Sequence, residues 1–331
     1  MRIFITGGSG FIGSRLAPLA VQDGHAVTVV TAVNNPAEKA RCDALAKVGI
    51  KVVVAPLEDA QVMARELRGH DVVVHLAAAQ HEAGAPESYF QQVNVEGTRR
   101  LADLAAGAGV RRFVHGSTIG VYGSAANGSL DEQSPLAPDN PYGRTKAAAE
   151  QVVRELKPPL EWCIVRISET YGPGDMRLLK LFRGIRNGRY LTAGNGENLH
   201  QLIYVDDLSR GLLAACTAPA MPGQTVVLAG SEVITTNAMV AHVGVAVGRT
   251  RGVLHVPLWP LAAAAVVFES TFGPLGLKPP LNRRRLDFFR KSFHFSTLQA
   301  ERLLGFRATT DFAAGAAQTA RWYRDQGMLG G

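Results

Sequence analysis

RIFITGGSGFIG, residues 2–13, contains a short apolar run that leads into a glycine-rich turn. The run Ile3–Ile5 predicts a buried strand, because it holds branched and aromatic residues and is followed by turn residues. After the turn, Phe11–Gln22 carries apolar residues at helical spacing and predicts a helix. This stretch therefore predicts a strand–turn–helix unit.

Three glycines lie in this turn, Gly7, Gly10 and Gly13. In a strand–turn–helix unit this spacing is typical of dinucleotide binding. The first glycine allows the tight turn, the second lets a pyrophosphate approach the backbone, and the third lets helix and strand pack closely. The free amides of the turn, with Phe11 and Ile12 beside them, and the positive end of the helix dipole would face the phosphates. We therefore expect a nucleotide to bind here.

Short runs rich in branched apolar residues recur through the first half of the chain and alternate with helical stretches. The further predicted strands are Val27–Val30, Val52–Val54, Val72–Leu76, Phe113–His115 and Cys163–Ile167. The predicted helices between them are Ala37–Lys47, Asp59–Leu67, Val93–Ala106 and Tyr142–Leu156. This alternation predicts βαβ units, and therefore an α/β, Rossmann-like doubly wound parallel sheet.

Beyond Arg166 glycine and proline turns become frequent, which indicates a smaller, interleaved C-terminal substrate lobe. We assign residues 1–170 to the nucleotide-binding domain. Residues 204–230 return to it, since Thr225–Leu228 predicts one more strand of the main sheet. Residues 171–203 and 231–331 form the predicted substrate lobe.

The composition, 47% hydrophobic over 331 residues, is sufficient for a full core. A formal net charge of +7 favours acidic partners in general, including phosphate-bearing cofactors, nucleic acid and anionic membranes. The densest basic cluster, Arg283–Arg285 with Arg290 and Lys291, is interrupted by apolar residues, which is typical of a solvated helix face. We expect no nucleic-acid partner.

Three cysteines, Cys42, Cys163 and Cys216, lie far apart in the sequence, which argues against a disulfide framework or a metal site. This pattern favours a reducing, cytoplasmic compartment. We also expect no signal peptide, because Met1 is followed directly by the first strand.

Leu261–Phe268 is the longest apolar stretch, and it is far shorter than the roughly 20 residues of a membrane-spanning helix. We expect a core helix here. A pocket wall, a dimer interface and peripheral contact with a membrane remain open alternatives.

The residue that closes the second strand separates NAD from NADP, because an acidic side chain there binds the ribose hydroxyls and repels a 2′-phosphate. Thr31 occupies this region, no acidic residue follows before Glu38, and no arginine follows before Arg41. The cofactor is therefore expected to be NAD or NADP.

Tyr142 and Lys146 lie four residues apart on a predicted helix, so their side chains share one face. A phenol is a poor base at neutral pH, but a nearby ammonium favours its ionised form. The same lysine can hydrogen-bond the ribose of the nicotinamide. Ser117 and Thr118, at the end of a predicted strand, could hold a substrate oxygen beside Tyr142.

In these features the chain resembles the extended short-chain dehydrogenase/reductases, the NAD-dependent epimerase/dehydratase group. The matching stretches are Thr6–Gly13, His75–Ala78, Asn94–Thr98, Ser117–Gly123, Tyr142–Lys146, Arg166, Tyr171–Gly174, Tyr204–Asp207, Leu303–Phe306 and Trp322–Tyr323. The resemblance implies that Tyr142 is the catalytic acid/base, Lys146 its partner and Thr118, rather than Ser117, the catalytic hydroxyl. It implies cofactor contacts at Tyr142, Lys146, Thr31, Leu76, Ala77, Ala78, Asn94, Ser117 and Ile167. For Asn94 we favour a structural tie between helix and sheet.

Ser117, Glu169 and His200 are the expected substrate contacts. Family members that act on nucleotide sugars usually carry asparagine in place of Glu169 and arginine in place of His200. A carboxylate beside a diphosphate is repulsive, so these differences argue against a nucleotide-sugar substrate.

The C-terminal lobe is similar to the 3β-hydroxysteroid dehydrogenase-like and dihydroflavonol-reductase-like branch, through Val256–Trp259, the run to Phe268, and Pro279–Arg283. We therefore expect hydride transfer to or from a secondary alcohol or ketone of a small, hydrophobic substrate. One alternative is a nucleotide-sugar epimerase/dehydratase with tightly held NAD, and another is a non-catalytic NAD(P)-binding sensor. The resemblance also implies a homodimer.

Overall fold

The computed structural model describes residues 1–80, 85–124, 128–250, 252–272, 286, 288–289 and 292–329. The basic cluster that begins at Arg283 and the similarity at Pro279–Arg283 lie wholly or largely outside these residues.

Seven parallel strands form the main sheet, in the order β12-β7-β5-β4-β1-β2-β3. They are β1 (Arg2–Thr6), β2 (Ala26–Thr31), β3 (Lys51–Val54), β4 (Val72–His75), β5 (Arg112–Thr118), β7 (Glu161–Ile167) and β12 (Gln224–Leu228). This confirms the predicted α/β fold and the late return of a strand to the sheet. The strand order reverses between β1 and β4, the position at which doubly wound sheets bind ligands.

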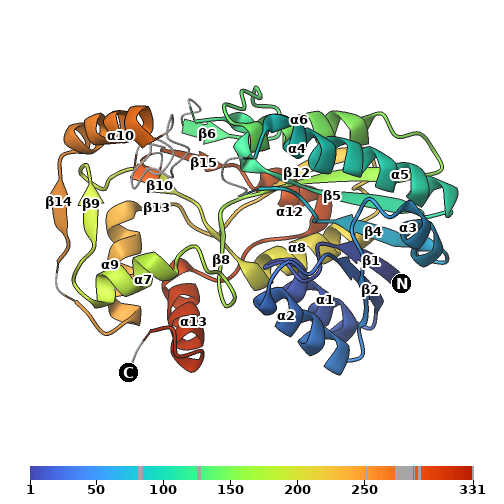
Figure 1. Ribbon diagram of the computed structural model, residues 1–331, viewed down its shortest axis with the longest axis horizontal. Helices are drawn as coiled ribbons and strands as arrows, with labels where there is room; N and C mark the ends of the chain where they lie inside the picture. The colour runs from blue at the N-terminus through green and yellow to red at the C-terminus, as the bar shows by residue number, and fades with distance from the viewer. Residues whose placement is uncertain are drawn as a thin grey trace.

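Helices cover both faces of the sheet (Figure 1). One layer contains α1 (Gly13–Gln22), α2 (Pro36–Lys47), α8 (Val205–Thr217) and α12 (Leu298–Leu304). The other contains α3 (Ala60–Leu67), α4 (Glu87–Phe90), a π-helical turn (Gln91–Glu96), α5 (Gly97–Gly107) and α6 (Pro141–Arg154). The helix predicted to start at Val93 is thus the end of a longer helical segment. A 3-10 turn, Ile119–Tyr122, follows β5 directly.

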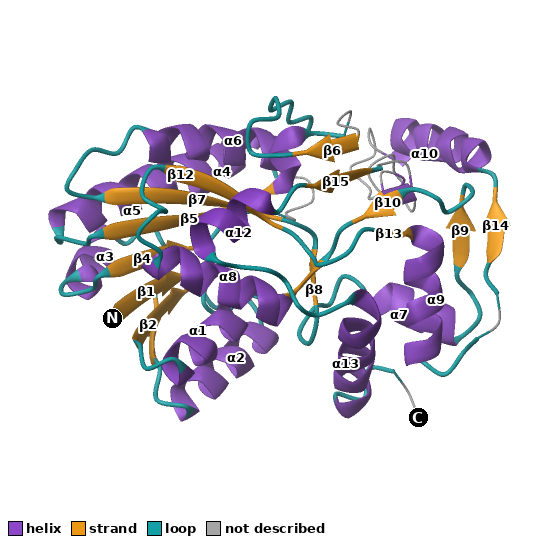
Figure 2. Ribbon diagram, turned by 180° about the vertical axis from the view of Figure 1, so that it is seen from behind, coloured by secondary structure: helices purple, strands orange, loops and turns teal. Residues whose placement is uncertain are grey.

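A smaller lobe faces the carboxyl ends of the strands, while the N-terminus lies at the opposite end of β1 (Figure 2). Its helices α7 (Leu179–Arg186), α9 (Thr236–Ala246) and α13 (Phe312–Asp325) share one buried apolar cluster. The short strands of the structure are paired as β8 (Thr170–Tyr171) with β11 (Ile203–Tyr204), β10 (Leu199–His200) with β13 (Ile234–Thr235), β9 (Leu191–Ala193) with β14 (Leu254–Val256), and β6 (Gly128–Leu130) with β15 (Phe293–Phe295).

The apolar stretch Leu261–Phe268 lies in α10 (Leu258–Phe272), at the surface of the lobe. The expected core helix is therefore wrong. Ala265 is the one buried residue of this helix, and Trp259 is 75% exposed. In the part of the chain that the structure describes, none of the helices is both long enough and apolar enough to cross a membrane.

Candidate active site

The glycine turn between β1 and α1 is too tight for side chains. Gly7 has φ +70°, and a Cβ there would lie 2.8 Å from the amide nitrogen of Ala77, beyond β4. At Gly13 a Cβ would lie 2.5 Å from the carbonyl oxygen of Gly7. The sequence interpretation missed Gly8, whose Cβ would meet Val29 of β2 at 2.0 Å. Gly8 is thus the glycine that allows the turn to lie close against β2, while Gly13 packs against the backbone of the turn itself.

We expect Gly13→Ala to abolish measurable cofactor binding, because the added methyl group would meet backbone atoms that cannot move without reshaping the turn. Gly107→Ala is the matched control, since a Cβ at that helical position has open space around it. Titration with NADH, followed by fluorescence, checks both variants. Wild-type affinity in Gly13→Ala would contradict this account of the turn.

At the end of β2 the structure brings together three side chains that are not adjacent in sequence. The hydroxyls of Ser9 and Thr31 lie 2.5 Å apart, and the Arg41 side chain donates through Nε to the carbonyl oxygen of Ser9, also at 2.5 Å. Arg41 belongs to α2, so sequence order alone placed it too far away to supply a positive charge here. The structure corrects that reading: a guanidinium lies against the glycine turn.

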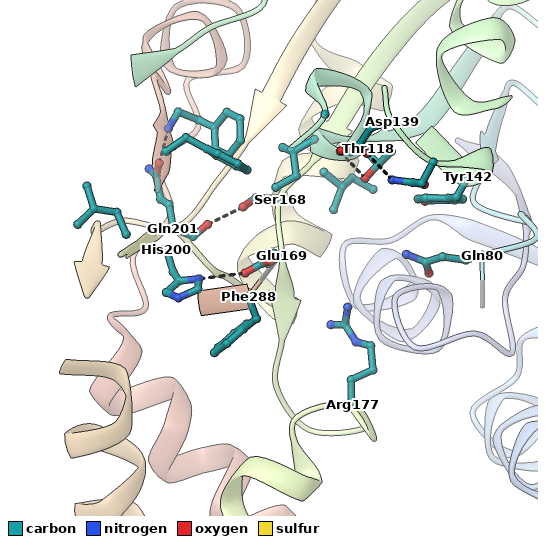
Figure 3. Close-up of a pocket in the computed structure, with 18 residues that line it drawn as sticks. Gln80, Thr118, Asp139, Tyr142, Ser168, Glu169, Arg177, His200, Gln201 and Phe288 are labelled. Atoms are coloured by element: carbon teal, nitrogen blue, oxygen red, sulfur yellow. Dashed lines mark hydrogen bonds and ion pairs between the residues drawn. The ribbon is translucent and has the colours of Figure 1, made fainter. Parts of the chain in front are cut away.

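Thr118 and Tyr142 border a cavity of about 660 Å³ beyond the carboxyl ends of the strands. Thr118 ends β5, and its Oγ1 accepts a hydrogen bond from the amide of Gly120 at 3.0 Å. Tyr142 lies in the first turn of α6, which is capped by the side chain of Asn140 accepting from the Gly143 amide. Figure 3 shows Thr118 and Tyr142 on one side of the cavity and Glu169 with His200 on the other.

Lys146 lies one helical turn after Tyr142 and is buried, with 2% exposed. Its Nζ lies 3.2 Å from Nε2 of His115, which projects from β5. Burial lowers the pKa of Lys146 to about 8 and holds the pKa of His115 well below its usual value. His115 is thus a neutral acceptor for the ammonium, which leaves two donors of Lys146 for other partners.

We expect the wild type to gain stability relative to Lys146→Met as the pH rises from about 8 to 10.5. In that window the unfolded chain holds a proton on Lys146 that the folded chain has released, so folding becomes easier. The difference between the folded and unfolded pKa values corresponds to a gain of about 3 kcal/mol in the free energy of unfolding across this window. Urea denaturation across this pH range measures the difference between the two proteins. Parallel stability curves would show that Lys146 is not desolvated as described.

Ser117 faces away from the cavity, in contrast to its expected contact with substrate. Its hydroxyl donates to Oε1 of Glu150 at 2.6 Å, and both side chains are buried. Glu150 also forms an ion pair with the buried Arg166, whose guanidinium donates to the hydroxyl of Tyr122. The Ser117 hydroxyl is thus part of a buried polar network behind β5, which is the physical reason for this correction.

Asn94 makes structural contacts, which tie the π-helical turn to the segment after β4 and to α6 rather than to the sheet itself. Its side chain bonds to the backbone amide and carbonyl of Ala79 and donates to Oγ1 of Thr145. These bonds occupy its amide group, so the structure lends no support to a cofactor contact. The predicted cofactor residues Leu76, Ala77 and Ala78 follow β4. Leu76 and Ala77 lie beside Gly7, and Ile167 lines the cavity.

Glu169 and His200 meet on the lobe side of the cavity, 3.6 Å apart between Oε2 and Nδ1. His200 is buried and also contacts the hydroxyl of Thr236 at 2.9 Å, whereas the Glu169 side chain is half exposed. Arg177 reaches the same cavity and forms an ion pair with Asp175. The sequence therefore identified Glu169 and His200 as residues of this side of the cavity but missed its arginine.

Several further cavity residues escaped the sequence interpretation. They are Gln80, Ile119, Gly120, Gly123, Asp139, Asn140, Ser168, Leu199, Gln201, Phe288, Phe293 and Phe295, besides Arg177. The phenylalanines come from the C-terminal region, where no motif spacing marks them.

The fold, the glycine turn and the Thr118–Tyr142 cavity define an NAD(P)-dependent enzyme of the extended short-chain dehydrogenase/reductase type. The profile of the "NAD dependent epimerase/dehydratase family" matches residues 3–230, and the chain belongs to this family.

Several relatives that extend over nearly the whole chain are dTDP-glucose 4,6-dehydratases. A dTDP-glucose 4,6-dehydratase of Streptomyces niveus is 30% identical, covering 98% of this chain and 93% of the relative. A crystal structure of a Streptomyces venezuelae dTDP-glucose 4,6-dehydratase with NAD bound is 30% identical, with a TM-score of 0.78 and 99% and 98% coverage. A farnesyl-dihydroquinoline-oxide ketoreductase of Stigmatella aurantiaca is 32% identical over 65% of this chain and 64% of its own.

These similarities correct one expectation from the sequence. The expected 3β-hydroxysteroid dehydrogenase-like and dihydroflavonol-reductase-like branch is not supported, because the most similar relatives named above over the full length are dTDP-glucose 4,6-dehydratases. The residues in the C-terminal lobe that carried that expectation are mostly apolar, and an apolar helix can serve a surface or a pocket in many families.

Proposed function

We propose that this protein is an NAD(P)-dependent epimerase or dehydratase of a nucleotide-linked sugar. The observation that carries the proposal is the placement of Thr118 and Tyr142 on one wall of a 660 Å³ cavity, with Lys146 buried one helical turn along. Full-length similarity to dTDP-glucose 4,6-dehydratases supports the substrate class.

The cradle for the cofactor fits a dinucleotide. A Cβ at Gly7 or Gly13 would lie within 3 Å of backbone atoms, so only glycine leaves this turn open to a pyrophosphate. The turn lies at the reversal of strand order between β1 and β4. A dinucleotide held by Gly7, Gly10 and Gly13 would supply a nicotinamide as a reversible hydride acceptor.

The roles of the side chains follow from their chemistry. Tyr142 takes the proton from the substrate hydroxyl and gives it back, and Thr118 orients the oxygen. The ammonium of Lys146 stabilises the phenolate form of Tyr142. His115 holds this ammonium in place, with 3.2 Å between its Nε2 and Nζ of Lys146.

The far side of the cavity supports a phosphate-bearing substrate. Arg177 brings a permanent positive charge. Glu169, 3.6 Å from the His200 ring, would repel a diphosphate, so the phosphates are expected beside Arg177 instead.

Net reduction of a ketone is the second candidate, and one observation favours it. Phe288, Phe293 and Phe295 line the cavity, and aromatic side chains suit an apolar substrate. The similarity to a ketoreductase agrees with this alternative.

Absorbance at 340 nm separates the two candidates. Purified protein is denatured to release any retained NAD(H) or NADP(H), and the intact protein is then assayed with nucleotide sugars. We expect retained NAD and product formation without net absorbance change. A steady absorbance change with an added ketone or alcohol would support the net reductase instead. Binding of neither cofactor would refute both.

The predicted homodimer, formed through α5 and α6, and the predicted cytoplasmic location belong to the same proposal. Light scattering of the purified protein tests the first of these.

A further inference from the structure

An apolar helix with a single charged residue, Glu269, lies largely uncovered on the outer end of the small lobe. Helix α10 carries no charged residue from Leu258 to Phe268. Within the described helix Ala265 is the one buried residue, and Trp259, Val266 and Val267 are 75%, 48% and 59% exposed. A helix that is apolar on all sides is normally enclosed by protein or by lipid. The exposed side of α10 is therefore expected to contact another apolar surface, of protein or of lipid.

The strand pair next to α10 in the chain adds apolar surface at the same end of the lobe. β14 ends two residues before α10, and it pairs with β9 so that Leu254 lies opposite Leu191. These two leucines are 73% and 49% exposed. Figure 1 shows α10, β9 and β14 together at the end of the molecule farthest from the N-terminal domain. We call Leu191, Leu254, Trp259, Val266 and Val267 the outer apolar surface.

The segments assigned to the substrate lobe from the sequence carry the positive charge of the protein. Residues 171–203 and 231–331 contain 17 lysines and arginines against 8 aspartates and glutamates. The remainder of the chain contains 18 against 20, so the net charge of +7 arises entirely in the lobe. A basic lobe with exposed apolar residues matches the two properties of an anionic membrane surface, its charge and its hydrocarbon.

We propose that the outer apolar surface docks this protein on an anionic lipid bilayer. Trp259 would lie at the level of the head groups, where indole rings are enriched, and α10 would lie in the plane of the interface. Two copies joined at this end would bring two basic lobes together, and like charges disfavour that arrangement. The inference concerns where the enzyme works, and it does not depend on the substrate proposed above.

Co-sedimentation with lipid vesicles tests the proposal on the full-length protein. Vesicles of phosphatidylcholine with about 30% phosphatidylglycerol are compared with pure phosphatidylcholine. We expect the wild type to bind the anionic vesicles, and this binding to weaken in high salt. The affinity of Val266→Asp/Val267→Asp for the same vesicles should be lower by about tenfold or more. Val54→Asp is the matched control, because Val54 is 62% exposed but lies on β3 of the other domain.

Three outcomes would overturn the proposal. The first is that the wild type binds neither kind of vesicle, and the second is that the double aspartate variant binds as tightly as the wild type. The third is that light scattering shows the wild type to be an oligomer and the variant a monomer, without vesicle binding, which would assign the surface to a second copy. NADH affinity and turnover of the variant in solution confirm that it is folded, and they separate a failure here from a failure of the proposed function.

Discussion

Replacing Tyr142 by phenylalanine is expected to lower turnover by about 10²- to 10⁴-fold, while cofactor affinity stays close to that of the wild type. The change removes one hydroxyl from the cavity wall and leaves the ring, the helix α6 and its Asn140 cap in place. Without the phenol the substrate oxygen has no group to take its proton beside the nicotinamide. Single-turnover assays and NADH titration measure the two quantities separately.

Tyr89→Phe is the matched control for this experiment. Tyr89 is 39% exposed on α4, outside the residues that line the cavity, and the same single hydroxyl is removed. We expect no change in turnover there. Undiminished turnover in Tyr142→Phe would move the acid/base role to another cavity group, with Glu169 as the first candidate. Cofactor binding without turnover of any substrate by the wild type would instead favour the sensor alternative.

The parts of this site that could be predicted from sequence are those fixed by local geometry. Gly7, Gly10 and Gly13 lie within one turn, and Tyr142 and Lys146 lie one helical turn apart. Spacing along the chain is then equivalent to placement in space. The alternation of strands and helices predicted the sheet for a similar reason, because each βαβ unit is itself local.

Placement that depends on distant residues could not be predicted. The Ser117 side chain looked available for substrate, but its hydroxyl donates a hydrogen bond to Glu150, which lies 33 residues later in the sequence. Arg41 looked too far from the glycine turn, yet the direction of α2 carries it there. The apolar composition of α10 indicated a core helix, but composition does not show whether other elements will cover a helix. Each of these errors concerns a partner that is remote in sequence.

The buried ion pair behind β5 gives the largest expected effect on stability. We expect Arg166→Met to lower the free energy of unfolding by about 3–5 kcal/mol, because the carboxylate of Glu150 would stay buried without its main partner. Arg166 donates to both oxygens of Glu150, through Nε at 3.0 Å and Nη2 at 2.8 Å, and both side chains are at most 2% exposed. Ser117 and the partly exposed Arg154 would remain as partners.

Arg15→Met is the control for Arg166→Met, because Arg15 makes the same two-bond contact with Asp206 at the surface, at 2.8 and 2.7 Å. Water screens that pair, so we expect a loss below about 1 kcal/mol. The double variant Glu150→Leu/Arg166→Met should recover much of the stability lost in Arg166→Met, since it leaves no buried charge unpaired. Urea denaturation measures all four proteins, and a loss in Arg166→Met no larger than in Arg15→Met would contradict the argument.

The pH dependence of the same variants provides an independent test. Burial alone would raise the pKa of Glu150, but the hydrogen bonds and charge of Arg166, together with the hydrogen bonds from Ser117 and Arg154, outweigh burial and hold that pKa below its usual value. This carboxylate therefore stabilises the fold above its unfolded pKa, and the contribution is lost as the pH falls through the folded pKa. In Arg166→Met the effect of burial prevails and the pKa of Glu150 rises. Protonation of Glu150 then removes the unpaired buried charge and restores part of the lost stability. The stability gap between wild type and Arg166→Met should thus narrow toward acidic pH. A gap that stays constant would show that the loss comes from packing rather than from charge.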